Sequence, residues 1–186
     1  MLCQGQAWES KTSRAMFRLF EARKQNRKIV DRLYAEIVEA AREPALYIEM
    51  GLADTVMGRF EALTIHVYLI LARCRGEPSL QALAQDLVDR FIADLDRSMR
   101  ELGVGDLSVP KKMRHFAGMF YKRVAAYDAA IVAGDREALG QALAAHALPE
   151  ATCADAADRL ADYMLTRKSS YEALAAENFL RGELSP

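Results

Sequence analysis

The sequence feature that most restricts the fold of this chain is the repeat of apolar residues at spacings of three and four. This period is typical of amphipathic α-helices, because it places the repeated side chains on one helical face. No segment combines strict apolar–polar alternation with turn residues at both ends, as a half-buried strand would require. The sequence therefore predicts an all-α fold without a β-sheet. The longest stripe consists of Leu80, Leu83, Leu87, Phe91, Leu95, Met99 and Leu102.

Capping and turn residues divide the pattern into about six or seven helices. Pro44 must end the first helix, Gly134 is expected to end the fourth, and Asp135 is expected to cap the fifth. Ser108 is the expected N-cap of the fourth helix. The expected helices cover residues 29–43, 55–74, 78–102, 109–132 and 138–147, followed after Pro149 by one long helix or by two short ones that break near Ser169–Ser170.

The composition is that of one globular domain. The chain has 186 residues, of which 52% are hydrophobic and 27% charged, with a formal net charge of −1. We expect residues 29–186 to form a single helical domain, residues 16–28 a basic amphipathic segment, and residues 1–15 a disordered or upstream extension. The three cysteines are far apart, which favours a reducing compartment over a disulfide framework.

No membrane-spanning helix or signal peptide is expected. The longest apolar run, Ala62–Ala72, is shorter than the roughly 20 residues that a spanning helix needs, and it predicts a buried core helix instead. The N-terminus lacks the uninterrupted hydrophobic region and small-residue cleavage site of a signal peptide. These observations predict a cytoplasmic protein whose contact with a membrane, if there is one, is peripheral.

Three cations begin the fourth predicted helix, where the helix macrodipole disfavours positive charge by roughly 0.3–1 kcal/mol each. Lys111, Lys112 and Arg114, which we call the basic ridge, belong to a segment from Ser108 to Val124 that has five cations and no acid. Such segregated charge in a nearly neutral chain indicates an interaction surface. The alternative is an ordinary solvated helix start.

The N-terminal segment is also basic. Residues 1–28 contain seven cations against two acids. Aromatic residues interleaved with cations can bind an anionic membrane surface, although the aromatic side chains of such a segment can also simply pack against the first helix. The candidate membrane-surface residues are Phe17, Arg18, Phe20, Arg23 and Lys24.

Candidate catalytic groups are few. The sequence contains no nucleophile-elbow, P-loop, dinucleotide-binding or zinc-protease motif. His66 lies in the most apolar predicted helix, where a hydrogen-bonded core histidine is commoner than a haem ligand or proton shuttle. The acids Asp86, Asp89, Asp94 and Asp96 alternate with arginines at spacings of three and four, which is typical of an ion-paired, solvated helix face. We expect no enzyme and no bound metal or cofactor.

Three segments carry a resemblance to a known family. Residues 51–61 (GLADTVMGRFE), residues 63–66 and, above all, residues 94–113 (DLDRSMRELGVGDLSVPKKM) resemble the ubiquinol–cytochrome c chaperone family, which assists assembly of respiratory complex III. Residues 16–20 (MFRLF) resemble the start of its bacterial members. The resemblance extends from about Met16 to about Gly134, and its motifs are long.

The resemblance implies a non-enzymatic assembly chaperone that binds newly made cytochrome b at the cytoplasmic face of a bacterial inner membrane. It further implies that a small partner protein and the ribosome are candidate partners. The residues expected to bind client or partner surround an apolar groove and the basic ridge beside it: Arg59, Phe60, Asp94, Asp96, Arg97, Leu107, Val109, Lys111, Lys112, Met113 and Arg114.

Two other functions remain open at this stage. One is a ribosome-binding or nucleic-acid-binding module that uses the basic ridge together with Lys122 and Arg123. Phe116 and Phe120 fall on the apolar stripe rather than beside these cations, which disfavours base stacking, so no direct readout of nucleic acid is expected. The other function is a carrier of a small apolar molecule such as a quinone or haem.

Overall fold

The computed structural model describes residues 25–103, 105–149 and 155–184. Within these ranges it contains eight α-helices, six of them seven residues or longer, and no strand, which confirms the predicted all-α single domain. The helices are an N-terminal helix over residues 25–40, α2 (Pro44–Ile48), α3 (Val56–Cys74), α4 (Gln81–Glu101), α5 (Val109–Ala133), α6 (Arg136–His146), α7 (Ala156–Ala173) and α8 (Ala176–Arg181), with a 3₁₀ turn, η1 (Pro78–Leu80), before α4.

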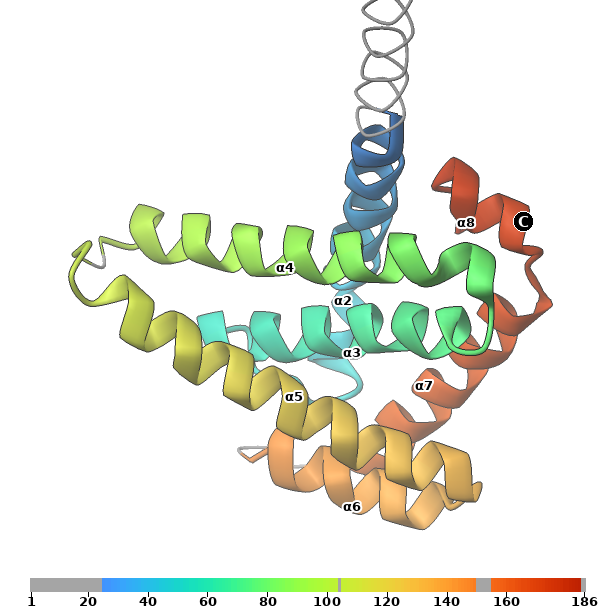
Figure 1. Ribbon diagram of the computed structural model, residues 1–186. Coiled ribbons are helices and arrows are strands. Elements are labelled where there is room, and N and C mark those ends of the chain that lie inside the picture. The colour runs from blue at the N-terminus through green and yellow to red at the C-terminus, as the bar shows by residue number, and fades with distance from the viewer. Residues whose placement is uncertain (1–24, 104, 150–154, 185–186) are drawn as a thin grey trace, which may run out of the picture.

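Helix α3 is the centre of the domain. It contacts α4, α5 and α7, and Figure 1 shows it between α4 and α5. The side chains of Ile65, Val67, Leu69 and Ile70 are all buried, as expected of a helix that is apolar on every side. Leu71 belongs to the run predicted to form a buried core helix, but its side chain remains partly exposed. In the described residues no helix is both long and apolar enough to cross a bilayer.

The helix boundaries follow the local sequence signals at most positions. Thr55 caps α3 by accepting a hydrogen bond from the amide of Gly58 at 3.2 Å, and Asp135 caps α6 by accepting from the amide of Ala138 at 2.9 Å. Gly134 ends α5 in the left-handed conformation, with φ of +67°.

Ser108 differs from the expectation. It occupies the N-cap position of α5, but its side chain makes no capping hydrogen bond. Its own backbone amide instead donates to the carbonyl of Gly105 at 2.8 Å, so a backbone turn, rather than a side-chain cap, precedes the helix. The predicted capping hydrogen bond of the serine side chain was therefore wrong, although the helix begins where expected.

Two other boundaries were misplaced. Pro78 opens the 3₁₀ turn η1 rather than α4 itself. The last long helix continues through Ser169 and Ser170, whose hydroxyls donate to the carbonyls of Leu165 and Thr166, and so find partners without breaking the helix. The break comes instead after Ala173, where Leu174 turns to an extended conformation.

The N-terminal helix is attached to the domain on two sides. Towards α4, Asp31 pairs with Arg90 at 2.9 Å and the Tyr34 hydroxyl donates to Asp94 at 3.0 Å. Towards the C-terminal residues, Glu36 accepts a hydrogen bond from the amide of Leu184 at 2.8 Å. In Figure 1, α8 lies near this helix. The position of the N-terminal helix is thus fixed by contacts with residues far away in the sequence.

Candidate functional site

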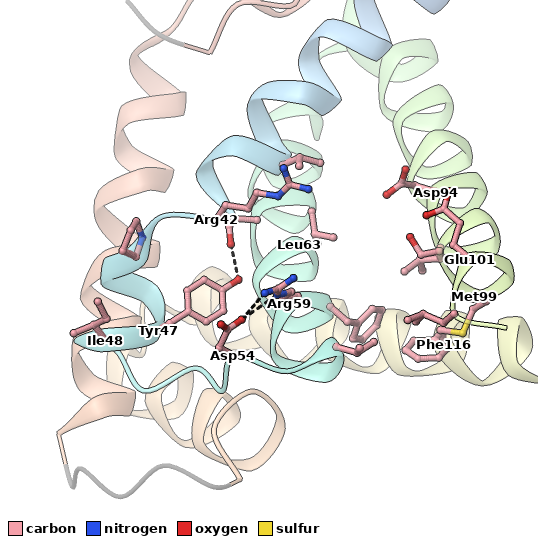
Figure 2. Close-up of a pocket in the computed structure, with 18 residues that line it drawn as sticks. Arg42, Tyr47, Ile48, Asp54, Arg59, Leu63, Asp94, Met99, Glu101 and Phe116 are labelled. Carbon is pink, nitrogen blue, oxygen red and sulfur yellow. Dashed lines mark hydrogen bonds and ion pairs between the residues drawn. The ribbon is translucent and has the colours of Figure 1, made fainter. Parts of the chain in front are cut away.

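A groove of about 720 Å³ opens where the N-terminal helix, α2, α3, α4 and α5 meet. Figure 2 shows Arg42, Tyr47 and Ile48 on one side of the groove, facing Asp94, Met99 and Glu101 of α4 on the other. Its apolar lining includes Val38 and Leu63 together with the buried side chains of Phe60, Leu95, Met99 and Phe116. The described lining contains no histidine and no cysteine. This arrangement is suited to binding an apolar chain segment or ligand.

Aromatic residues form a rigid base under the groove. The ring of Phe60 packs edge-on against that of Phe116, with centroids 5.0 Å apart, and stacks on Phe91 at 6.3 Å. These three rings come from α3, α5 and α4 respectively, so they hold together the helices that line the groove.

A buried ion pair lies beside this aromatic base. Arg123 of α5 donates to both carboxylate oxygens of Glu61 on α3, at 2.5 and 2.6 Å, and its guanidinium lies 5.7 Å from the ring centroid of Phe60. Glu61 is 1% exposed and Arg123 7%. Burial raises the pKa of the Glu61 carboxyl above its ordinary value, while the hydrogen bonds and charge of Arg123 oppose this shift. Arg123, counted from the sequence among the surface cations, is therefore a structural residue.

Gly58 allows the loop before α3 to pack against the first turn of that helix. A Cβ atom at this position would lie 1.8 Å from the carbonyl oxygen of Ala53, a distance that only a shift of the backbone could relieve. This close approach places Asp54 and Val56 on the rim of the groove.

The close approach predicts a large difference between two glycine substitutions in helices. Gly58→Ala should lower the free energy of unfolding by about 1–3 kcal/mol through steric overlap, as in overpacked cores. Gly118→Ala in α5, where an added Cβ meets nothing within 4 Å, should instead raise it by about 1 kcal/mol through helix propensity. Urea unfolding of both variants measures the difference. Equal effects would show that Gly58 is not held against Ala53.

Charged residues surround the opening of the groove. Arg59 and Asp54 form an exposed ion pair at 2.9 Å, each side chain being 67% exposed. Across the groove, Asp94 accepts hydrogen bonds from Tyr34 at 3.0 Å and from Arg90 at 3.2 Å. Burial, reinforced by the neighbouring Asp94 carboxylate, raises the pKa of the Tyr34 hydroxyl well above its usual value, so this tyrosine stays protonated and continues to donate.

Three of the residues predicted to bind client or partner line this groove: Arg59, Phe60 and Asp94. The others lie on α4 or around the α4–α5 turn. Asp96 pairs with Arg100 along α4 at 2.8 Å, and Arg97 is exposed. Around the turn, Val109 is buried and Met113 partly buried, whereas Leu107, Lys111, Lys112 and Arg114 are exposed. The candidate membrane-surface residues Phe17, Arg18, Phe20, Arg23 and Lys24 lie outside the described residues.

One side of the groove was not anticipated from the sequence. Helix α2 supplies Tyr47, whose hydroxyl donates to the carbonyl of Ala41 at 2.7 Å, and Ile48, which is 81% exposed. Pro44 was expected to end a helix, but it also occupies the first turn of α2. The motif PALYI offers too few residues for its helical period to be recognised.

His66 is a hydrogen-bonded core residue, as the commoner alternative predicted. Its Nδ1–H donates to the carbonyl of Ala62 at 2.7 Å, which leaves Nε2 to accept from the Tyr163 hydroxyl at 2.8 Å. Burial lowers the pKa of His66 to about 4, so the ring is neutral at pH 7. Among the described residues, no group of three or more histidine, cysteine and acidic side chains is placed to hold a metal ion.

Comparison with known proteins agrees with the resemblance seen in the sequence. The crystal structure of the Cbp3 homolog from Brucella abortus is 41% identical to this chain, with a TM-score of 0.81 over 91% of this chain and 95% of that one. The ubiquinol-cytochrome-c reductase complex assembly factor 1 of Xenopus laevis is 24% identical over 106 residues, covering 56% of this chain. The chain matches 53% of the length of that curated relative.

The similarity also covers most of the domain described above. A model of the ubiquinol-cytochrome C chaperone family matches residues 49–185, a range that includes α3 to α8 and the α4 and α5 residues of the groove. Because this match covers well over half of the chain, the protein belongs to the ubiquinol–cytochrome c chaperone family.

Proposed function

We propose that this protein is a non-enzymatic assembly factor of ubiquinol–cytochrome c reductase, and that it binds newly made cytochrome b in its groove. Family membership and the name of the Xenopus laevis relative support the assembly role. The match to a Brucella abortus structure supports a bacterial protein. Its proposed place of action is the cytoplasmic face of the inner membrane. A small partner protein and the ribosome are further candidate partners.

The observation that supports client binding best is the exposure of apolar residues at the groove. Ile48 is 81% exposed, Leu102 60% and Val56 54%, and all three line the same opening. A single exposed apolar residue is ordinary, but several around one concave surface are typical of a binding site. Cytochrome b is a membrane protein, and its apolar segments need cover until they are inserted and paired. The groove offers such cover.

The charges at the rim favour a defined orientation of the bound segment. Arg42 and Arg59 lie on one side of the groove, and Asp94 and Glu101 lie on the other (Figure 2). A segment with an acidic and a basic residue flanking its apolar part would match both sides. Complementary charges of this kind contribute more to orientation and selectivity than to affinity.

Introducing charge into the groove should impair client capture. We expect the double change Ile48→Asp with Val56→Asp to reduce recovery of cytochrome b from membranes at least tenfold, or about 1.4 kcal/mol of binding free energy. Both side chains are more than half exposed, and an acid at the start of α3 suits the helix macrodipole, so the melting temperature should hardly change.

The control is Val132→Asp, which introduces an acid at another exposed apolar residue, 74% exposed, at the end of α5 and outside the groove lining. This variant should recover cytochrome b as the unmodified protein does. Equal recovery by all three proteins would exclude the groove as the client site. Co-purification of a quinone or haem with the unmodified chain, lost in the groove variant, would instead identify a small-molecule carrier.

A further inference from the structure

The turn between α4 and α5 exposes the apolar side chain of Leu107 to solvent. Leu107 is 100% exposed, and Leu102, where α4 ends, is 60% exposed. Figure 1 shows this turn at the left end of the domain, far from α7. Val109, two residues after Leu107, is 1% exposed. The start of α5 thus buries one apolar side chain and leaves Leu107 in solvent.

The basic ridge follows this leucine, within the first two turns of α5. Lys111, Lys112 and Arg114 are exposed, and none of them forms an ion pair with another described residue. Arg100, by contrast, pairs with Asp96 of α4 and with Asp106 of the turn, so Asp106 is paired with α4 and not with the ridge. The positive charge of the ridge is therefore available to an outside partner.

We propose that Leu107 and the basic ridge form a contact site for the surface of an anionic phospholipid bilayer. Leu107 enters the interface between headgroups and acyl chains, while Lys111, Lys112 and Arg114 bind lipid phosphates. An exposed apolar side chain followed by cations at the start of the next helix matches the two layers of such a surface, apolar below and anionic above. Each cation near an anionic membrane surface strengthens binding by about fivefold.

The residues around the turn favour a bilayer over nucleic acid. Binding to single-stranded nucleic acid commonly uses exposed aromatic rings beside the cations, on which bases stack. Phe116 is buried within the domain, and the exposed Tyr121 lies seven residues beyond Arg114, so the exposed ring nearest the cations is the small imidazole of His115. Contact with a phosphate backbone does not remove a fully exposed leucine from water, whereas insertion into a bilayer interface does and is therefore favourable. The site also differs from the groove, so its membrane contact does not depend on a bound client.

Vesicle flotation of the purified protein tests this site. Vesicles of phosphatidylcholine alone are compared with vesicles that also contain phosphatidylglycerol. We expect the unmodified protein to float with the anionic vesicles, and Lys111→Glu with Lys112→Glu to reduce the bound fraction at least tenfold. Leu107→Ser should reduce it several-fold. All three side chains are exposed, so the melting temperatures should stay close to that of the unmodified protein.

Two further variants separate this site from other sources of binding. Arg159→Glu with Lys168→Glu makes the same change in net charge on α7, and it should leave flotation nearly unchanged. Arg18→Glu with Arg23→Glu tests the N-terminal segment. The proposal is overturned if the α7 variant loses as much binding as the ridge variant, if Leu107→Ser binds normally, or if only the N-terminal variant loses binding.

A competition experiment tests the alternative partner. The anionic vesicles are mixed with a single-stranded RNA oligonucleotide at equal phosphate concentration. Preferential transfer of the protein to the RNA, abolished by Lys111→Glu with Lys112→Glu, would assign the basic ridge to nucleic acid and reject the bilayer. Retention on the vesicles supports the proposal. Because no cytochrome b is present, failure here is distinguishable from failure of the groove to capture its client.

Discussion

Replacing Arg123 by methionine should lower the free energy of unfolding by about 3–5 kcal/mol, the largest effect expected of any single change outside the apolar core. The change leaves the carboxylate of Glu61 buried at 1% exposure without its bidentate partner. Removal of one member of a buried pair is costly because the remaining charge can neither reach water nor find another cation. Urea unfolding at neutral pH measures the loss.

The pH dependence of this variant identifies the cause. Without Arg123, burial alone acts on Glu61 and raises its pKa further, so the folded variant takes up a proton that the unfolded chain releases. An acid whose pKa is raised on folding contributes less stability as pH increases. The variant should therefore be closer in stability to the unmodified protein at about pH 5 than at about pH 8. A loss that is independent of pH would contradict this explanation.

A double change provides the control. Glu61→Leu with Arg123→Met removes both charges and leaves two apolar side chains, and such replacements are often neutral or stabilising. The double variant should therefore be markedly more stable than Arg123→Met alone. If both are equally unstable, the loss comes from the packing of the arginine over Phe60 rather than from an uncompensated charge.

Leu69→Ala should cost about 2–5 kcal/mol, because it removes a large side chain from the centre of α3. Leu69 is 1% exposed and lies on a helix that packs against three others, so the surrounding side chains have little freedom to fill the space. Leu71→Ala, two residues away on the same helix but partly exposed, should cost clearly less. Urea unfolding of both variants under the same conditions measures the difference in free energy of unfolding. Equal losses would contradict the central position of Leu69.

The apolar period was sufficient to predict the long helices, because each one buries a continuous stripe. In α4, Leu83, Leu87, Phe91, Leu95 and Met99 are all buried as the spacing predicts. Leu102 continues the same spacing but is 60% exposed, because it lies just after the end of α4, at the open groove. Periodicity identifies a helical face, but it does not show where the helix ends or where a groove stays open.

The groove was only partly predictable. The resemblance to a chaperone family pointed to Arg59, Phe60 and Asp94, which line it. The contribution of α2 was missed, because a five-residue helix has too few apolar positions to show a period. The pairing of Glu61 with Arg123 was missed as well. The sequence signal was available, since Glu61 is an isolated acid at the start of the most apolar stretch of the chain, but its partner lies 62 residues away.

The groove also bears on how the domain is held together. Its lining comes from the N-terminal helix, α2, α3, α4 and α5. An apolar segment bound there would contact all five at once and exclude water from side chains that are now solvated, such as Ile48. The bound segment would then act as a missing piece of the hydrophobic interior. In that state the protein and its client would share one core, and release of the client would return part of that core to water.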